Sequence, residues 1–330
     1  MLTVTNCTIR DNSANGSLGA SGGGIYDNYA LTVTNSTISG NSTIGPGSSG
    51  GGIQSVNATL TVTNSTISGN SANASFGDQG DAYGGGIWAD TLTVTNSTIS
   101  GNSAIGGEFG YGGGIYGQVG FNLSNSIVAN NTANAGGPDI FGGFSGSYNL
   151  VGVDPMLGPL QNNGGPTFTR ALMTGSPAIN AGDPNFTPPP NYDQRGTGYP
   201  RVVNGRIDIG AFEVQPAYAA QVQQPINADG TSVFNVRRGV VPVKFTLTLN
   251  GVATCDLPPA TIAVTRTAGG TIGAIDESIY IGAADTGSNF RINSCQYVYN
   301  LSASALGVGT YRVDIMINGQ VVGSATFQLK

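Results

Sequence analysis

Aromatic and acidic side chains recur at matching places in the first half of the chain, and they are the groups there best suited to chemistry. In a repeated phrase, the position directly after the isoleucine is occupied in turn by five residues: Tyr26, Gln54, Trp88, Tyr116 and Phe141. The loops before these positions add Tyr83, Phe109 and Tyr111, and the carboxylates of Asp78, Asp81 and Glu108. Aromatic faces stack on sugar rings, and carboxylates bind hydroxyl groups. The pattern indicates a carbohydrate-binding surface with six candidate residues: Trp88, Tyr116, Tyr26, Tyr83, Tyr111 and Phe109.

The same residues have a structural interpretation, in which the aromatic rings stack on one another and shield the edge of the fold. A catalytic interpretation uses the loop carboxylates, because glycosidases need two carboxyl groups about 5–9.5 Å apart. Asp78 or Asp81 could meet that spacing with Glu108, since adjacent strands lie about 4.8 Å apart. The chain has no histidine, which excludes Ser–His, Cys–His and His–metal chemistry. We expect a non-enzymatic protein without cofactor or metal; the alternative is a glycoside hydrolase.

A repeat positions these residues. The phrase LTVTNSTISGNSA begins at Leu2, Leu31, Leu60 and Leu92, and a degenerate copy begins at Phe121. The starts are 29, 29, 32 and 29 residues apart, and a GGGI phrase precedes each new start until PDIF takes its place. Short β-branched runs separated by Gly and Asn predict three strands per coil of a parallel β-helix. The loops between the second Asn and GGGI vary in length, and such insertions often form a binding face.

Alternation along the strands predicts which side chains are buried. Three apolar stacks should fill the interior: Leu2 with its equivalents, Ile9 with its equivalents, and Ile25 with its equivalents. Two asparagine series, which begin at Asn6 and Asn12, predict amide ladders at the corners. The outward Thr3/Thr5 pair and its equivalents resemble the T-x-T face of β-helical ice-binding proteins, which leaves ice binding as a further alternative.

From Tyr148 the repeat gives way to turn-rich phrases, including DQRG and DIGAFE. Over Leu2 to Glu213 the chain resembles bacterial choice-of-anchor-type surface proteins with a right-handed, pectin-lyase-like β-helix, similar to polymorphic outer-membrane proteins. The phrases VPVKF, FRINSCQYVYNLS and ATFQLK resemble the PxKF-type Ig-like domain. These resemblances imply an exported or surface-displayed, adhesin-like protein without assigned catalytic residues.

The predicted fold class is all-β: a right-handed parallel β-helix of about 29 residues per coil, followed by an antiparallel β-sandwich. The expected parts are repeats over 1–147, terminal coils and a cap over 148–214, a linker over 215–230 and the sandwich over 231–330. The cap concentrates six charged residues: Asp193, Arg195, Arg201, Arg206, Asp208 and Glu213. We interpret them as ion pairs that close the last coil; the alternative is a polar active site.

Composition and cysteines bear on location and partners. The net charge is −6, and no Lys or Arg lies between Arg10 and Arg170, which argues against nucleic-acid binding. No apolar run is long enough for a membrane span, and no export signal is visible, so we interpret the sequence as part of a longer exported chain. Cys7 replaces a repeated serine, which leaves Cys255 and Cys295 as the expected disulfide. We expect an extracellular or cell-surface monomer whose partner is a polysaccharide or a cell-surface glycan.

Overall fold

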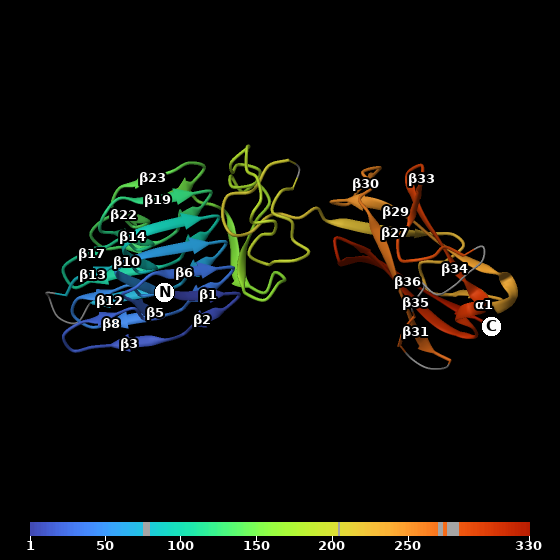
Figure 1. Ribbon diagram of the computed structural model, residues 1–330, viewed down its shortest axis with the longest axis horizontal. Helices are drawn as coiled ribbons and strands as arrows, with labels where there is room; N and C mark the ends of the chain where they lie inside the picture. The colour runs from blue at the N-terminus through green and yellow to red at the C-terminus, as the bar shows by residue number, and fades with distance from the viewer. Residues whose placement is uncertain (75–79, 204, 270–272, 276–283) are drawn as a thin grey trace. The chain divides into compact units, whose positions relative to one another are not determined.

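The computed structural model describes residues 1–74, 80–203, 205–269, 273–275 and 284–330. The chain divides into two compact units, Met1–Gln215 and Pro216–Lys330. The first unit contains a parallel β-solenoid of about five coils, and the second contains antiparallel sheets (Figure 1). The predicted all-β fold class is therefore confirmed. No helix in the described part of the chain is long and apolar enough to cross a membrane.

Equivalent strands of successive coils pair in parallel and form four sheets along the solenoid. The largest sheet contains β1 (Leu2–Thr5), β5 (Ile25–Asp27), β6 (Leu31–Thr34), β10 (Ile53–Thr63), β14 (Ile87–Thr95), β18 (Ile115–Gly117), β19 (Phe121–Ser124), β22 (Ile140–Phe141) and β23 (Phe144–Ser145). The second contains β2 (Thr8–Arg10), β7 (Thr37–Ser39), β11 (Thr66–Ser68), β15 (Thr98–Ser100), β20 (Ile127–Ala129) and β24 (Leu150–Val151). We call this second sheet the TIS sheet, after its repeated sequence.

Two smaller sheets complete each coil, so a coil has more strands than the three expected. The third sheet contains β3 (Ser13–Asn15), β8 (Ser42–Ile44), β12 (Ser71–Ala74), β16 (Ser103–Gly106) and β21 (Thr132–Ala133). The fourth contains β4 (Ala20–Ser21), β9 (Ser48–Ser49), β13 (Ala82–Tyr83) and β17 (Gly110–Tyr111). Strands of two to four residues with small side chains carry too weak an alternation to be recognised from sequence.

The three predicted apolar stacks form the solenoid core. Leu31 pairs with Leu2 on one side and with Leu60 on the other, and Ile38 and Ile53 lie in equivalent stacks. Leu31, Ile38 and Ile53 have no exposed surface. The repeat therefore fixes both the register and the burial of the strands.

The GGGI phrases allow neighbouring coils to approach closely. A Cβ atom on Gly85 would lie 2.2 Å from the carbonyl oxygen of Ser103 and 2.5 Å from that of Gly113. No side chain fits at such distances, so only glycine is accepted at this corner.

The asparagine series that begins at Asn12 forms the predicted amide ladder. Oδ1 of Asn70 accepts hydrogen bonds from the backbone N–H (3.0 Å) and from Nδ2 (2.9 Å) of Asn41. Nδ2 of Asn70 donates to Oδ1 of Asn102 and to the carbonyl oxygen of Ile38. Asn102 repeats the pattern with Asn131, and the ladder ends on the carboxylate of Asp139.

The series that begins at Asn6 forms no amide ladder, so that prediction is wrong. These residues adopt a positive φ of about 50°, which asparagine tolerates, but Oδ1 of Asn35 and of Asn64 has no hydrogen-bond partner. The serine that follows each asparagine connects the coils instead, because Oγ of Ser65 accepts the backbone N–H of Ser36 and Ser97 repeats this contact.

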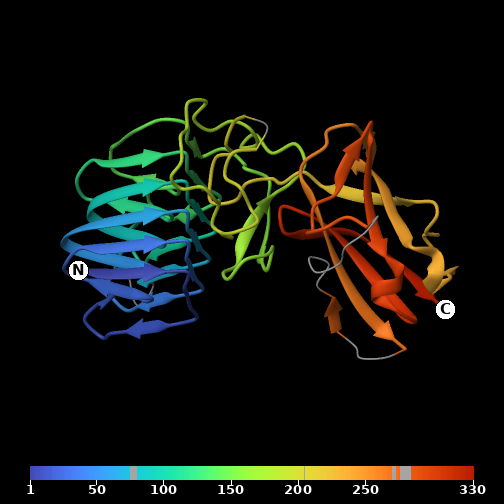
Figure 2. The same ribbon diagram turned by 45° about the vertical axis from the view of Figure 1, so that its right-hand side comes forward.

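Residues 163–214 lie along the TIS sheet (Figures 1 and 2), and we call them the lateral segment. The side chain of Gln194 is buried and bonds to Thr66 (2.6 Å), Thr37 (2.9 Å) and Thr167 (3.0 Å). The backbone N–H of Ala211 donates to Oγ1 of Thr98 in the next coil. We expected this segment as a cap on the last coil. The structure places it beside the coils, where the hydroxyls of Thr37, Thr66 and Thr98 bond to it. In the last coil the equivalent residue is Ile127, which packs against Ile209 and Phe212 of the segment.

The strands β25 (Leu157–Gln161) and β26 (Thr169–Leu172) form an antiparallel hairpin; the lateral segment begins in the loop between them and includes β26. The charged residues follow and are mostly buried. Asp193 and Arg195 form an ion pair of 2.6 Å, and the Arg195 guanidinium lies over the rings of Tyr199 and Phe212. Arg201 donates to the carbonyl oxygens of Asp208 and Gly210.

The second unit packs two five-stranded sheets around a shared apolar core that includes Phe245, Tyr297 and Phe327. One sheet contains β27 (Tyr218–Gln223), β29 (Val240–Leu249), β30 (Val252–Thr254), β33 (Arg291–Asn293) and β34 (Gln296–Ser302). The other contains β28 (Ser232–Phe234), β31 (Ala260–Ala268), β32 (Gly273–Ile275), β35 (Gly309–Ile317) and β36 (Gln320–Leu329). Two short helices, η1 (Val236–Arg238) and α1 (Ala303–Leu306), complete the unit.

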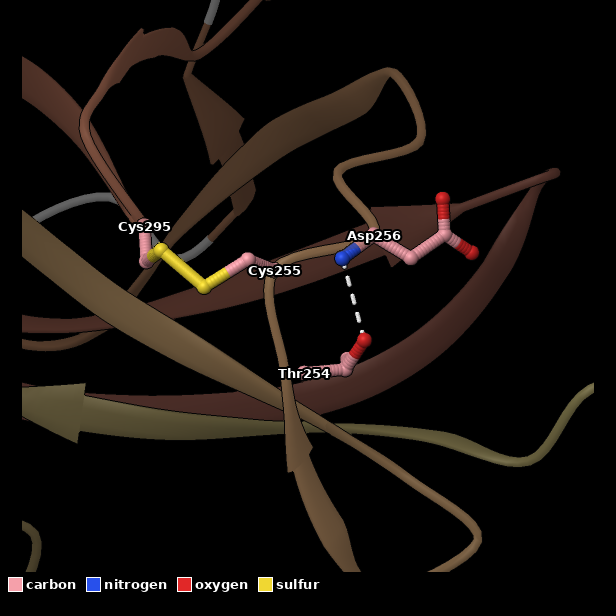
Figure 3. Close-up of a disulfide and its surroundings, with 4 residues drawn as sticks. All are labelled: Thr254, Cys255, Asp256 and Cys295. Atoms are coloured by element: carbon pink, nitrogen blue, oxygen red, sulfur yellow. Dashed lines mark hydrogen bonds between the residues drawn. A yellow bond between two sulfur atoms is a disulfide. The ribbon is translucent and has the colours of Figure 1, made fainter.

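One feature of this unit differs from the sequence analysis. Strand β27 lies within the stretch 215–230 that we expected as a linker, and it pairs with β29 from Tyr218 to Gln223. The chain turns between β33 and β34, where Ser294 has a positive φ. Cys295 lies in that turn and is bonded to Cys255, which follows β30 (Figure 3); their Cα atoms are 5.1 Å apart. Cys7 is a free, exposed thiol.

The amide ladder yields the first prediction. Asn70→Ala should lower the free energy of unfolding of the solenoid by about 2–4 kcal/mol, because the buried N–H and Nδ2 of Asn41 lose their acceptor. Urea unfolding followed by circular dichroism measures the change. The control is Asn12→Ala in the first coil, where the side chain is exposed, and it should cost less than about 1 kcal/mol. Equal losses in the two variants would show that the ladder does not hold the coils together.

Candidate functional site

The aromatic residues that follow the GGGI and PDIF isoleucines form one column across three coils. Trp88 of β14 pairs in register with Tyr116 of β18, and Tyr116 pairs with Phe141 of β22. The rings of Trp88 and Tyr116 are stacked with centroids 6.4 Å apart, and those of Tyr116 and Phe141 with centroids 5.2 Å apart. Parallel strand pairing repeats a side chain at the spacing of the strands, so the column follows from the register.

A second column lies beside the first. Tyr83 of β13 stacks on Tyr111 of β17 at 6.1 Å, and Phe109 stacks on Tyr111 at 6.0 Å. The two columns touch, because Tyr83 meets the edge of Tyr116 at 5.1 Å and Tyr111 meets Phe141 at 4.8 Å. We call the combined set the aromatic ladder: Trp88, Tyr116, Phe141, Tyr83, Tyr111 and Phe109.

The structure brings together five of the six candidate residues and leaves Tyr26 apart. Tyr26 occupies the same register, but the coil between it and Trp88 carries Gln54 at that position. Its side chain is 54% exposed, and within the described ranges it stacks on no other ring. Phe141 joins the ladder although it was not among the candidates; its place after Ile140 in the repeat was the available signal.

The stacking determines which ring faces a ligand could reach. Tyr116 lies between Trp88 and Phe141, so both of its faces are covered by other rings. Trp88 ends the ladder: Tyr116 covers one face, and the next coil on the other side carries Gln54. Rings inside the ladder therefore serve mainly structure. Phe109 (40%) and Phe141 (38%) are its exposed members, and Trp88 at its end is half-buried.

One of the three candidate carboxylates is engaged by the ladder. Oδ2 of Asp81 accepts a hydrogen bond of 2.8 Å from the hydroxyl of Tyr83. Burial, together with this hydrogen bond and the negative charge of Asp81, raises the pKa of Tyr83 to about 12. Glu108 is exposed, and its backbone N–H donates to the carbonyl oxygen of Gly80, which places it in the coil beside Asp81. Asp78 lies outside the described residues.

The buried charges of the lateral segment are unsuited to an active site. Asp193, Arg201, Asp208 and Glu213 are at most 1% exposed, so no substrate reaches them in this structure. Burial raises the pKa of Glu213 to about 9, and burial also raises the pKa of Asp208 and lowers that of Arg201. Their hydrogen bonds go mainly to backbone groups of the same segment, as with Glu213, whose Oε2 accepts the N–H of Asp208. The arrangement supports the structural interpretation.

Comparison with known proteins identifies no relative: no family model, no curated protein and no solved structure matches this chain.

The contact of Asp81 with Tyr83 yields the second prediction. Asp81→Asn should lower the pKa of Tyr83 from about 12 towards the ordinary value of 10.0, because a neutral amide no longer opposes the tyrosinate. The ultraviolet absorbance of tyrosinate, compared between matched proteins with and without Tyr83→Phe, isolates this residue. Asp90→Asn is the control: Asp90 is also acidic, but its carboxylate accepts the backbone N–H of Asn57 and is not among the groups that shift the pKa of Tyr83. An unchanged Tyr83 titration in Asp81→Asn would contradict the hydrogen bond.

Proposed function

We propose that this protein is a non-enzymatic, extracellular or surface-attached β-solenoid that contacts glycans through the aromatic ladder. In this proposal it is an adhesin-like relative of choice-of-anchor-type surface proteins, and its second unit is a PxKF-type module. The solenoid supplies a rigid support, because every coil is bonded to its neighbours through strands and side-chain ladders. The disulfide supports export, since such bonds persist in oxidising surroundings.

The observation that carries the proposal is the aromatic ladder, which ends at the half-buried Trp88. Its indole projects from strand β14 on the side opposite the buried Ile87 and is held by the stacked ring of Tyr116. A ring held in this way loses little conformational entropy when a ligand packs against its remaining exposed surface. A saccharide ring there would lie beside Gln54 of the neighbouring coil and towards Tyr26 of the coil after it, whose polar groups suit sugar hydroxyls.

Two alternatives have weaker support. A glycoside hydrolase would use Asp81 and Glu108, but Asp81 is bonded to Tyr83 and therefore held as part of the ladder. Ice binding would use the Thr-x-Thr face as a flat plane. Thr34 and Thr63 of that face line a cavity together with Pro190 and Tyr192, so one threonine column adjoins the lateral segment instead of open solvent.

The third prediction tests the ladder as a binding surface. A glycan array with the purified chain should identify a saccharide whose binding Trp88→Ala weakens at least tenfold, because a stacked anchor supplies much of the binding energy. The fold should survive, since Ile87 and not Trp88 fills the core. Tyr29→Ala is the matched control: Tyr29 is 69% exposed in the same unit and lies outside the ladder.

The same experiment separates binding from catalysis. The double variant Asp81→Asn, Glu108→Gln should retain most of the binding, and no saccharide on the array should be cleaved by the unchanged chain. Cleavage that the double variant abolishes would favour the hydrolase. Binding that is unaffected by Trp88→Ala, or a Trp88→Ala chain that does not fold, would show that the ladder is structural.

A further inference from the structure

A cavity of about 440 Å³ lies between the TIS sheet and the hairpin of β25 and β26, away from the aromatic ladder. Its floor consists of side chains and glycines from the first three coils, and its opposite wall comes from the hairpin and the loop between its strands. The lining residues are Thr8, Arg10, Asp11, Thr37, Ser39, Gly40, Ser68, Gly69, Leu160, Pro166, Phe168 and Arg170. All of them belong to the first unit, so the cavity is a feature of one compact body.

The charge of this cavity is unusual for the chain. Arg10 and Arg170 are the only Lys or Arg residues before Arg195, and both line it. They are 160 positions apart in the sequence, and the packing of the hairpin against the solenoid brings them to the same cavity. One carboxylate, Asp11, also lines it and lies 3.4 Å from Arg10, with both side chains more than half exposed. Two guanidinium groups and one carboxylate therefore line the cavity, which leaves its lining with an excess of positive charge.

Arg170 is held so that part of its guanidinium remains available. Its Nε donates to Oγ of Ser68 at 2.8 Å, and its Nη1 donates to the carbonyl oxygen of Gly158 at 3.2 Å. Among the described residues, no acceptor bonds to Nη2 and no carboxylate pairs with Arg170. Burial lowers the pKa of this arginine, which shows that its charge is partly withdrawn from water. An incoming oxyanion would compensate a charge that the protein itself leaves unpaired.

The remaining lining suits a small ring with hydroxyl groups. Leu160, Pro166 and Phe168 form an apolar wall, and the Phe168 side chain is 40% exposed. Thr8 and Ser39 place hydroxyl-bearing side chains on the opposite floor. An apolar face opposite hydroxyls and next to a cation matches a sugar ring that carries an acidic group.

We propose that this cavity binds an acidic monosaccharide unit, with its carboxylate or sulfate on Arg170 and Arg10 and its ring against Phe168. The two arginines have different roles. Arg170 is the fixed partner, because its guanidinium is already oriented by Ser68 and Gly158. Arg10 is the mobile partner, and it exchanges its exposed contact with Asp11 for the bound anion. This site is independent of the aromatic ladder.

Isothermal titration calorimetry of the full chain with sodium glucuronate, glucose 6-sulfate and neutral glucose tests the proposal. At least one of the acids should bind, and glucose should not. The acid that binds more tightly shows whether the site prefers a carboxylate or a sulfate. Arg170→Gln should weaken binding of that acid more than about tenfold, because it removes a partly buried charged hydrogen-bond donor.

Three further variants keep the test valid even if Arg170→Gln does not fold. Arg10→Gln should weaken binding roughly three- to fivefold, as expected for an exposed ion pair, and Asp11→Asn should strengthen it by a similar factor. Arg237→Gln is the matched control, because it removes the same charge from an exposed position in the second unit and should leave binding unchanged. Glucose that binds as tightly as the acids would overturn the proposal. Equal effects of Arg10→Gln and Arg237→Gln, or no binding of either acid in the millimolar range, would also overturn it.

Discussion

The stacking of coils depends on a buried asparagine that each coil contributes after its Ile-containing strand. Each amide oxygen accepts two hydrogen bonds from the preceding coil, and each amide nitrogen reaches the next amide and a backbone carbonyl. A buried corner would otherwise contain unpaired backbone groups, each of which costs about 1–3 kcal/mol. Because every ladder residue depends on both of its neighbours, a coil is stable only within the stack. The close approach at the glycine corner follows from the same spacing.

Because buried residues hold the coils together, the residues on the outside of the solenoid can vary. The interior is filled by Leu, Val and Ile at equivalent positions, so exposed positions in the same strands can take aromatic residues without cost to the core. The aromatic ladder forms on one side, where the loops are longest and most variable. The TIS sheet on another side presents Thr37, Thr66 and Thr98, and these hydroxyls bind the lateral segment through Gln194 and Ala211.

The lateral segment also accounts for the most unusual feature of the surface. A chain with 9% charged residues places its early arginines beside one cavity, because Arg170 lies on strand β26 of this segment and Arg10 lies on the first strand of the TIS sheet. The buried ion pair of Asp193 and Arg195 and the enclosed Arg201 hold the rest of the segment in place. The side that binds the lateral segment and the side that carries the aromatic ladder thus have different chemistry.

The repeat alone determined the solenoid, its apolar stacks and the Asn12 ladder, because contacts in a solenoid join residues one repeat apart. Equivalent letters in the sequence, such as Leu31 and Leu60, are therefore neighbours in space. The same logic placed Tyr26, Trp88 and Tyr116 in one register, but only the structure showed that Gln54 separates Tyr26 from the ladder and that Tyr116 is covered on both faces. Where the repeat ends, the sequence no longer indicates which residues are neighbours in space. Tertiary packing alone decided the long-range contacts that have no periodicity, such as the position of Gln194 against Thr37 and Thr66 and the pairing of β27 with β29. It also placed Arg10 and Arg170 in the lining of one cavity.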